Sequence, residues 1–340
     1  MSQPVIVLGD ANVDLVIHLP DYHHGDRDLT KSVPQLFGGG TGANTAVALA
    51  RLGVPTIFMG TIGDDGFGRW IQADFAREGV DTRGLTVLHD AFTPQVIAMI
   101  QPDGERHLVI FPPEGGAHTH MESAHLNVDL LRSAAWVHTT GMCLRASPVR
   151  ESILEGLRIA HEAGVRTSLD LNLRVELWGY DEPMRRTTEA AIALADVVLG
   201  SGDEEMIPIT GAATVEEAAR QLANGQRTVV ARLGSAGALA VDRMGIVYRK
   251  AALPVTVKDT LGAGDAFNAG YIAALLGYGE GRTGELGGLT MGAQVAAYKI
   301  AHGGARATPH PKALREFLAE APISDDDETH RRRRPRYCEG

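Results

Sequence analysis

The sequence predicts a doubly wound α/β fold: a mostly parallel sheet flanked by helices, with a small β-strand lid. Short apolar runs that end in glycine or a polar residue recur along the chain, and stretches of helical character separate them. Strand and helix in alternation imply a parallel sheet covered on both faces. Two turn-rich segments with alternating apolar residues, about 12–37 and 92–117, break this rhythm and predict the lid.

The composition excludes several classes of protein. Apolar residues make up 44% of the 340 residues and charged residues 22%, which argues against long disorder, collagen and a membrane bundle. Glycine is abundant, at 40 of 340 residues or about 12%, against about 7% in an average domain. The net charge of −10 disfavours nucleic acid and anionic membranes as partners.

The cysteines and the N-terminus indicate a reducing compartment. Cys143 and Cys338 are far apart and lack CxxC spacing, so neither a disulfide framework nor a thiolate zinc site is indicated. The opening MSQPVIVLGD has no basic region and too short an apolar run for a signal peptide. We therefore expect a cytoplasmic protein.

The strands of the predicted sheet are continuous apolar runs, as expected where both faces of a parallel sheet are covered. They lie at 5–9, 56–60, 135–141, 166–172, 196–200 and 227–234. The best-defined helix is 148–163, with Ser147 as its N-cap, Pro148 at its first position and Gly164 after its end.

The sequence also predicts the structure of the lid and of the C-terminal segment. The segment QVIAMIQPDGERHLVIF predicts a hairpin that turns at residues 102–104. Beyond Pro322 the chain becomes SDDDETHRRRRPRYCEG, so we expect 322–340 to be a charged, disordered tail.

One motif near the C-terminus predicts an anion site. In DTLGAGDAFNAGYIAALL, Gly262, Ala263 and Gly264 precede Asp265 and a helix of small residues. Glycines at a helix start let an anion approach the unpaired N–H groups, and no Walker-type lysine accompanies them. Asp265 beside such a cradle can accept the proton of an attacking hydroxyl. The alternative is a helix-terminal carboxylate stabilised by the dipole.

A second motif, FGGGTGANTAVALARLG at 37–53, combines a glycine run with Asn44 at the start of a helix. Glycines 38–40 permit backbone dihedrals that other residues avoid. The Asn44 amide can donate and accept hydrogen bonds, which suits a neutral polyol. The alternative is that Asn44 only caps the helix and the glycines only form a turn.

The two motifs together, in this order, resemble those of the ribokinase-like (PfkB) carbohydrate kinases, over residues 3 to about 321. The resemblance implies one kinase domain with a mostly parallel sheet and a β lid. It implies ATP-dependent transfer of the γ-phosphate to a hydroxymethyl group of a pentose- or ketohexose-like sugar, with Mg²⁺. It leaves open a monovalent cation such as K⁺ and a homodimer formed through the lid.

The resemblance also assigns roles to residues. Asn12 and Asp14, two apart in GDANVDLV, lie on one face of an extended segment. With Gly39, Gly40 and Asn44 they match the sugar-binding positions. Asp265 matches the catalytic base, and Gly262, Ala263 and Gly264 match the anion hole.

The nucleotide and metal positions match the family less well. Arg232, Gly234 and Gly237 resemble the nucleotide-side turn, and Gln294 falls near the adenine pocket; the alternative for Arg232 is an exposed strand-end residue. Glu205 matches the acid of the NxxE motif and would hold Mg²⁺ through water, but Gly202 stands where the family has asparagine.

The sequence does not identify the substrate. DLNLRVELW resembles a segment of fructokinases and 2-keto-3-deoxygluconate kinases, in which Arg174 would hold a sugar-acid carboxylate or pair with Glu176 or Asp181. A nucleoside kinase is an alternative. The aromatic content of 5% gives it little support, because a nucleoside base needs side chains on which to stack. The alternative from another class is a non-catalytic sugar or nucleotide sensor.

Overall fold

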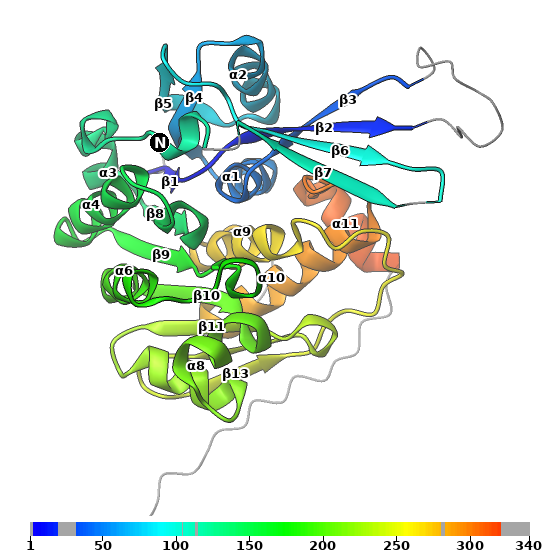
Figure 1. The fold of residues 1–340 in the computed structure, drawn as a ribbon. Helices are drawn as coiled ribbons and strands as arrows, with labels where there is room; N and C mark the ends of the chain where they lie inside the picture. Colours follow the sequence, from blue (N-terminus) through cyan, green and yellow to red (C-terminus); the bar gives the residue numbers. More distant parts are fainter. Residues whose placement is uncertain (1–2, 20–31, 104, 113–114, 280–282, 321–340) are drawn as a thin grey trace, which may run out of the picture.

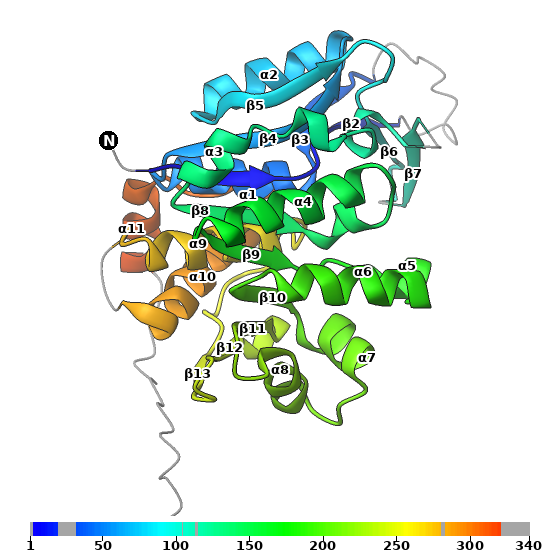
Figure 2. The same cartoon turned by 90° about the vertical axis from the view of Figure 1, so that its left-hand side faces the viewer.

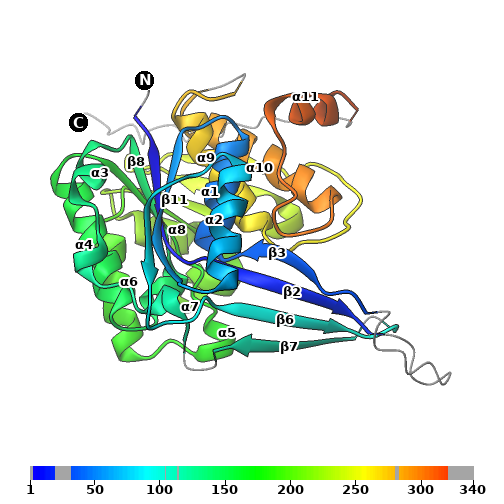
Figure 3. The same cartoon turned by 90° about the horizontal axis from the view of Figure 1, so that it is seen from above.

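The computed structural model describes residues 3–19, 32–103, 105–112, 115–279 and 283–320. A large sheet with helices on both faces forms the body, and a small sheet extends away from it (Figures 1 and 3). The predicted tail at 322–340 lies outside the described residues. Among the helices that are described, none is both long and apolar enough to cross a membrane.

The large sheet has nine described strands in the order β13-β12-β11-β10-β9-β8-β1-β4-β5. Pairing is parallel from β11 to β5, and β12 and β13 add an antiparallel edge. The strands are β1 (Val5–Leu8), β4 (Thr56–Gly63), β5 (Asp81–Leu88), β8 (Trp136–Thr140), β9 (Arg166–Asp170), β10 (Val197–Ser201), β11 (Thr228–Arg232), β12 (Ala238–Val241) and β13 (Val247–Lys250).

Each face of this sheet has its own apolar core, because successive side chains of a strand point to opposite faces. Val5 and Val7 of β1 pack with the helices of one face, and Ile6 and Leu8 pack with those of the other. The first face carries α1 (Thr41–Arg51), α2 (Gly66–Glu78), α9 (Ala263–Leu275), α10 (Gly284–Ala301) and α11 (Pro311–Glu320). The second, turned toward the viewer in Figure 2, carries α3 (Val128–Ser133), α4 (Val149–Glu162), α5 (Val175–Trp178), α6 (Glu182–Ala193), α7 (Ile207–Thr210) and α8 (Val215–Ala223).

The lid is a four-stranded sheet in the order β3-β2-β6-β7. Its strands are β2 (Asn12–His18), β3 (Gln35–Gly39), β6 (Gln95–Ile100) and β7 (Arg106–Phe111). The antiparallel pairing of β6 with β7 confirms the predicted hairpin. Only three residues separate β1 from β2, so the lid begins where the first strand of the body ends.

The strand order places the site. From β1 the chain builds β4 and β5 on one side and then β8 to β11 on the other, so the order reverses between β1 and β8. Ligands of open α/β sheets bind at the carboxyl ends of the strands beside such a reversal. Here those ends are Gly9-Asp10 and Thr140-Gly141.

The structure confirms the predicted strands and corrects the start of one helix. The helix α4 begins at Val149 with Pro148 as its cap, rather than at Pro148 with Ser147 as its cap, and no side chain caps its first turn. Strand β5 was not predicted, because its sequence DTRGLTVL lacks a continuous apolar run. The short antiparallel strands β12 and β13 were not predicted either.

Candidate active site

Two polar side chains of the lid lie beside the glycine run. The Asn12 amide donates to Oδ1 of Asp14 at 2.6 Å, so the two side chains share one face of β2 as predicted. Gly39 pairs with Asn12 in the lid sheet, and a Cβ there would lie 2.6 Å from both Asn12 Nδ2 and Asp14 Oδ1. Burial raises the pKa of Asp14 against the opposing effects of Asn12 and Arg306. A side chain at residue 39 would therefore displace the Asn12 and Asp14 side chains.

The first turn of α1 is neutralised by an aspartate that the sequence analysis missed. Asp10 accepts hydrogen bonds from the backbone N–H groups of Thr41 and Gly42 at 2.9 and 3.0 Å and from the Thr41 hydroxyl at 3.0 Å. Gly40 caps the helix with φ of 93°, and a Cβ there would lie 2.6 Å from the Asp10 carbonyl oxygen. The signal for Asp10 was its place directly after the first strand.

Asn44 and Asp265 meet across the interface of α1 and α9. The Asn44 amide nitrogen donates to Oδ2 of Asp265 at 2.9 Å, and each residue is 7% exposed. Gly40 holds the cap position of α1, so the interpretation of Asn44 as only a capping residue is wrong. The two predicted motifs thus meet at one hydrogen bond.

The N-terminus of α9 is open toward this point. Gly262 is its cap with φ of 78° and offers no side-chain hydrogen bond. The first intrahelical bond is donated by Ala266 to the Gly262 carbonyl at 3.0 Å, which leaves the N–H groups of Gly264 and Asp265 without an intrahelical acceptor. Ala263, in contrast, donates its N–H to Thr260 at 3.1 Å, so it is the weakest member of the predicted anion hole.

Asp265 has an unusual acidity. Its burial raises its pKa to about 7, and the charges of Asp170 and Asp10 act in the same direction. The Asn44 hydrogen bond and Arg232 oppose that rise. A carboxyl with this pKa exchanges protons near neutral pH, as a general base must.

Arg232 belongs to a buried network rather than to the solvent-exposed end of a strand. Its guanidinium pairs with Asp170 at 2.8 Å and donates to Oδ1 of Asn268 at 2.7 Å. The Asn268 amide then donates to Asp170 at 2.9 Å. A Cβ on Gly264 would lie 3.4 Å from the guanidinium carbon, so Arg232 lies against the first turn of α9. Asp170 and Asn268 were missed because their roles arise only from this contact.

Glu205 is buried beside the same network. Its two oxygens accept the backbone N–H groups of Leu173 at 2.6 Å and Ser201 at 2.7 Å. Burial and the neighbouring Asp170 raise its pKa, and Arg232 lowers it. A Cβ on Gly202 would lie 2.6 Å from Cγ1 of Val215, so a larger residue at this position would require Val215 to move.

Four predicted residues lie outside these contacts. Arg174 is exposed, has φ of 50° and, within the described chain, pairs with neither Glu176 nor Asp181. Gly234 and Gly237 form the turn between β11 and β12, and Gly237 is required by packing because a Cβ there would lie 2.1 Å from the Lys250 carbonyl oxygen. The remaining residue, Gln294, is half-buried on α10.

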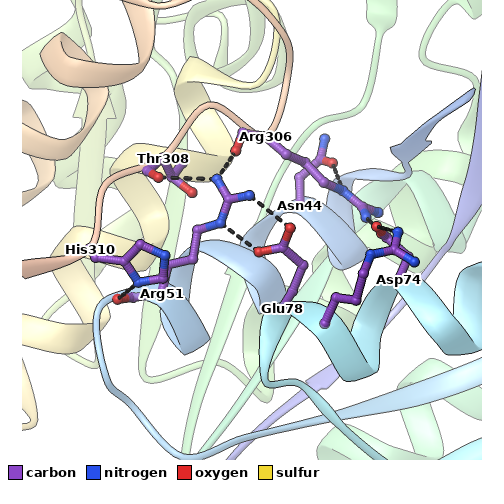
Figure 4. Close-up of polar contacts among 8 residues, drawn as sticks. Asn44, Arg51, Asp74, Glu78, Arg306, Thr308 and His310 are labelled. Atoms are coloured by element: carbon purple, nitrogen blue, oxygen red, sulfur yellow. Dashed lines mark hydrogen bonds and ion pairs between the residues drawn. The ribbon is translucent and has the colours of Figure 1, made fainter. Parts of the chain in front are cut away.

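One further group reaches the site from the segment that follows α10. Arg306 contacts Asn44, Gly39 and Asp74, and Figure 4 shows its contacts with Asn44 and Asp74. No motif in the sequence marks Arg306 as a residue of the site.

These groups suit the transfer of an anionic group to an alcohol. Asn12, Asp14 and Asn44 offer donors and acceptors to hydroxyls. Asp265 can take a hydroxyl proton, and the open end of α9 with Arg232 can stabilise negative charge that develops nearby.

Comparison with known proteins gives the same assignment. A family model described as pfkB family carbohydrate kinase matches residues 2–313. A fructokinase of Klebsiella pneumoniae is 35% identical over 281 residues, 82% of this chain and 86% of that protein. An aminoimidazole riboside kinase of Salmonella typhimurium is 34% identical over 272 residues, 80% of each chain. The solved structure of a fructokinase with bound ATP from Xylella fastidiosa superposes with a TM-score of 0.79 at 26% identity, over 94% of this chain and 99% of that one.

Proposed function

This chain belongs to the pfkB family of carbohydrate kinases and is an ATP-dependent kinase, and we propose that it phosphorylates a hydroxymethyl group of a fructose-like ketohexose. The fructokinase relatives support this choice of sugar. The observation that carries the proposed phosphoryl transfer to a polyol is the hydrogen bond between Asn44 and Asp265. It joins the residues proposed to bind the sugar to the buried base.

In the proposed mechanism the sugar binds between the lid and the glycine run. Asn12, Asp14 and Asn44 exchange hydrogen bonds with its hydroxyls, and the glycines let the backbone approach closely. Two of these side chains belong to the lid strand β2, so sugar binding orders the lid over the site and excludes water.

Asp265 acts as the general base. It accepts the proton of the reacting hydroxyl as that oxygen attacks the γ-phosphate, and the N–H groups of Gly264 and Asp265 stabilise the charge that develops. Arg232, lying against the same turn, adds positive charge. Gly234, Gly237 and Gln294 stay predictions for the nucleotide side.

Mg²⁺ would neutralise phosphate charge during transfer. Carboxylate oxygens have two lone pairs each, so Glu205 keeps acceptor capacity for metal-bound water beyond its two backbone bonds. The donor set therefore fits a hydrated Mg²⁺ held through Glu205. A monovalent cation stays a prediction, as does a homodimer through the lid.

A substrate panel tests the proposal. ADP release is measured with fructose, ribose, 2-keto-3-deoxygluconate and aminoimidazole riboside, for the wild type and for Asp265→Asn. We expect the highest kcat/KM with fructose, and a kcat in the variant that is lower by about 10²–10⁴-fold while both substrates still bind. Near-normal turnover by Asp265→Asn would contradict the assignment of the base.

The riboside kinase relative favours one second candidate, a kinase for a ribonucleoside-like substrate. A preference for aminoimidazole riboside over fructose in the same panel would establish it. The sensor alternative predicts thermal shifts with ligands and no ADP release with any of them.

A further inference from the structure

Arg306 joins three segments that build the sugar side of the site. It follows α10, and its Nε donates to Oδ1 of Asn44 at 2.9 Å. One Nη donates to the Gly39 carbonyl at 2.9 Å. The other pairs with the carboxylate of Asp74 on α2 (Figure 4). Each of the three guanidinium nitrogens therefore has a hydrogen-bond partner.

The space for this guanidinium is built into the chain. The Arg306 side chain is only 11% exposed, and it lies 5.8 Å from the ring centre of Phe75. A Cβ on Gly38 would lie 1.8 Å from its Nη1, so the first glycine of the run leaves room for it. Its partner Asp74 is also buried.

The contact with Asn44 fixes the orientation of that amide. A guanidinium can only donate, so the Asn44 oxygen must face Arg306. The amide nitrogen then faces Asp265, where it donates to the carboxylate at 2.9 Å. If the amide turned over, its oxygen would face Asp265, and only a protonated Asp265 could hydrogen-bond to it.

We propose that Arg306 is a positioning residue for phosphoryl transfer: it locks the Asn44 amide in the one orientation that favours the charged, proton-accepting form of Asp265. This inference rests on the proposed role of Asp265 as the base. Arg306 acts through Asn44, since the guanidinium that acts directly on Asp265 is Arg232.

Different charged residues surround Asp265 and Arg306. Asp10, Asp170, Arg232 and Lys299 act on Asp265. The groups that act on Arg306 are Asp14, Asp74, Glu78 and Arg51. A change at Arg306 can therefore be compared with a change at a neighbour that does not touch Asn44.

The test is the pH profile of kcat/KM for Arg306→Met. Without the hydrogen bond from Arg306, the Asn44 amide can turn over and accept a hydrogen bond from protonated Asp265. We therefore expect the acid limb, the fall of kcat/KM at low pH, to move upward by about one pH unit. At pH well above the limb Asp265 is charged in both proteins, and turnover should recover toward the wild-type value. A uniform loss at every pH, or an unmoved limb, would overturn the proposal.

Arg51 supplies the matched control. It pairs with Glu78 and donates to the backbone carbonyls of Arg306 and Thr308, so it anchors the same segment from behind. Arg51→Met should lower Tm as Arg306→Met does and leave the acid limb in place. If Arg306→Met does not fold, Asp74→Asn weakens the anchor of the guanidinium and should move the limb in the same direction by less.

Two further variants separate this inference from the proposed function. In an Asn44→Ala background, Arg306→Met should move the limb no further, because the amide through which it acts is gone. If Asp265→Asn keeps its turnover, the proposed base is wrong; if Asp265→Asn is inactive and Arg306→Met leaves the limb unmoved, only the role of Arg306 is wrong.

Discussion

At Asp265 the chain buries a carboxylate where its charged form is costly. Desolvation and the charges of Asp170 and Asp10 raise its pKa, and the Asn44 hydrogen bond and Arg232 oppose that rise. The folded protein therefore holds the Asp265 proton more tightly than the unfolded chain does. A group needed for chemistry thus lowers stability at the pH where it works.

The pH dependence follows from this shift. The pKa of Asp265 is about 7 in the folded protein and about 4 in an unfolded chain. Turnover should fall as pH drops through about 7, because the base becomes protonated. The free energy of unfolding should fall as pH rises from about 4 to 7, because the folded state binds the extra proton in that window.

Two measurements check these predicted pH dependences of turnover and stability. Initial rates between pH 5.5 and 9 give the acid limb, and a limb below pH 5 would contradict the assignment. Thermal unfolding of Asp265→Asn should show a Tm gain over the wild type that is larger at pH 8 than at pH 5. Equal gains at the two pH values would mean that the charge of Asp265 costs no stability.

Two helix N-termini face the site, and the chain treats them differently. Asp10 fills the first turn of α1, so the protein itself compensates that end. The first turn of α9 has no side-chain cap, although it carries Asp265. The positive end of α9 therefore remains available to an anionic ligand, while α1 serves to place Asn44.

The cap glycine of α9 allows a test at this scale. Gly262 has φ of 78°, and a Cβ there would lie 2.4 Å from the Ala305 carbonyl oxygen. Gly262→Ala should lower Tm and reduce kcat by an order of magnitude or more, because the clash displaces the first turn. The readouts are thermal unfolding and steady-state kinetics.

Gly277, just beyond the other end of α9, is the control. It has a similar φ of 82°, but a Cβ there meets no atom within 4 Å. Gly277→Ala should cost about 1–2 kcal/mol through backbone strain alone and leave kcat unchanged. If both variants lost activity equally, the open end of α9 would not be the phosphate site.

The elements differ in how well the sequence predicts them. Six of the parallel strands are continuous apolar runs, so they could be recognised, and glycine with polar residues marked α1 and α9. Strand β5 mixes charged and apolar residues and escaped recognition. Arg306 carries no local pattern at all: its partners come from three distant segments, and only the folded chain brings them together.

At the scale of the whole molecule, the lid leaves an apolar edge uncovered. Strand β7 lies at the edge of the lid sheet, and its Leu108 and Ile110 are 65% and 62% exposed. Val109 and Phe111 on its other face are also exposed. An edge strand of this kind can pair with another strand, and a second copy of the chain would supply an equivalent edge.

We therefore expect a dimer that forms through the lid. Replacing Leu108 and Ile110 by lysine together should convert it to a monomer, measured by sedimentation or light scattering across a concentration range. Met244→Lys is the control, because Met244 is a 79% exposed apolar residue in the β12–β13 turn. A wild-type monomer at every concentration would contradict the expectation.

The hydrogen bond between Asn44 and Asp265 also concerns biosynthesis, because it spans 221 residues of the chain. A ribosome adding about 5–20 residues per second takes roughly 10–45 s to cover that interval. The sugar-side half of the site leaves the exit tunnel first, without its base and without Arg306. A nascent chain therefore cannot use ATP until residue 265 has emerged and α9 has packed against α1.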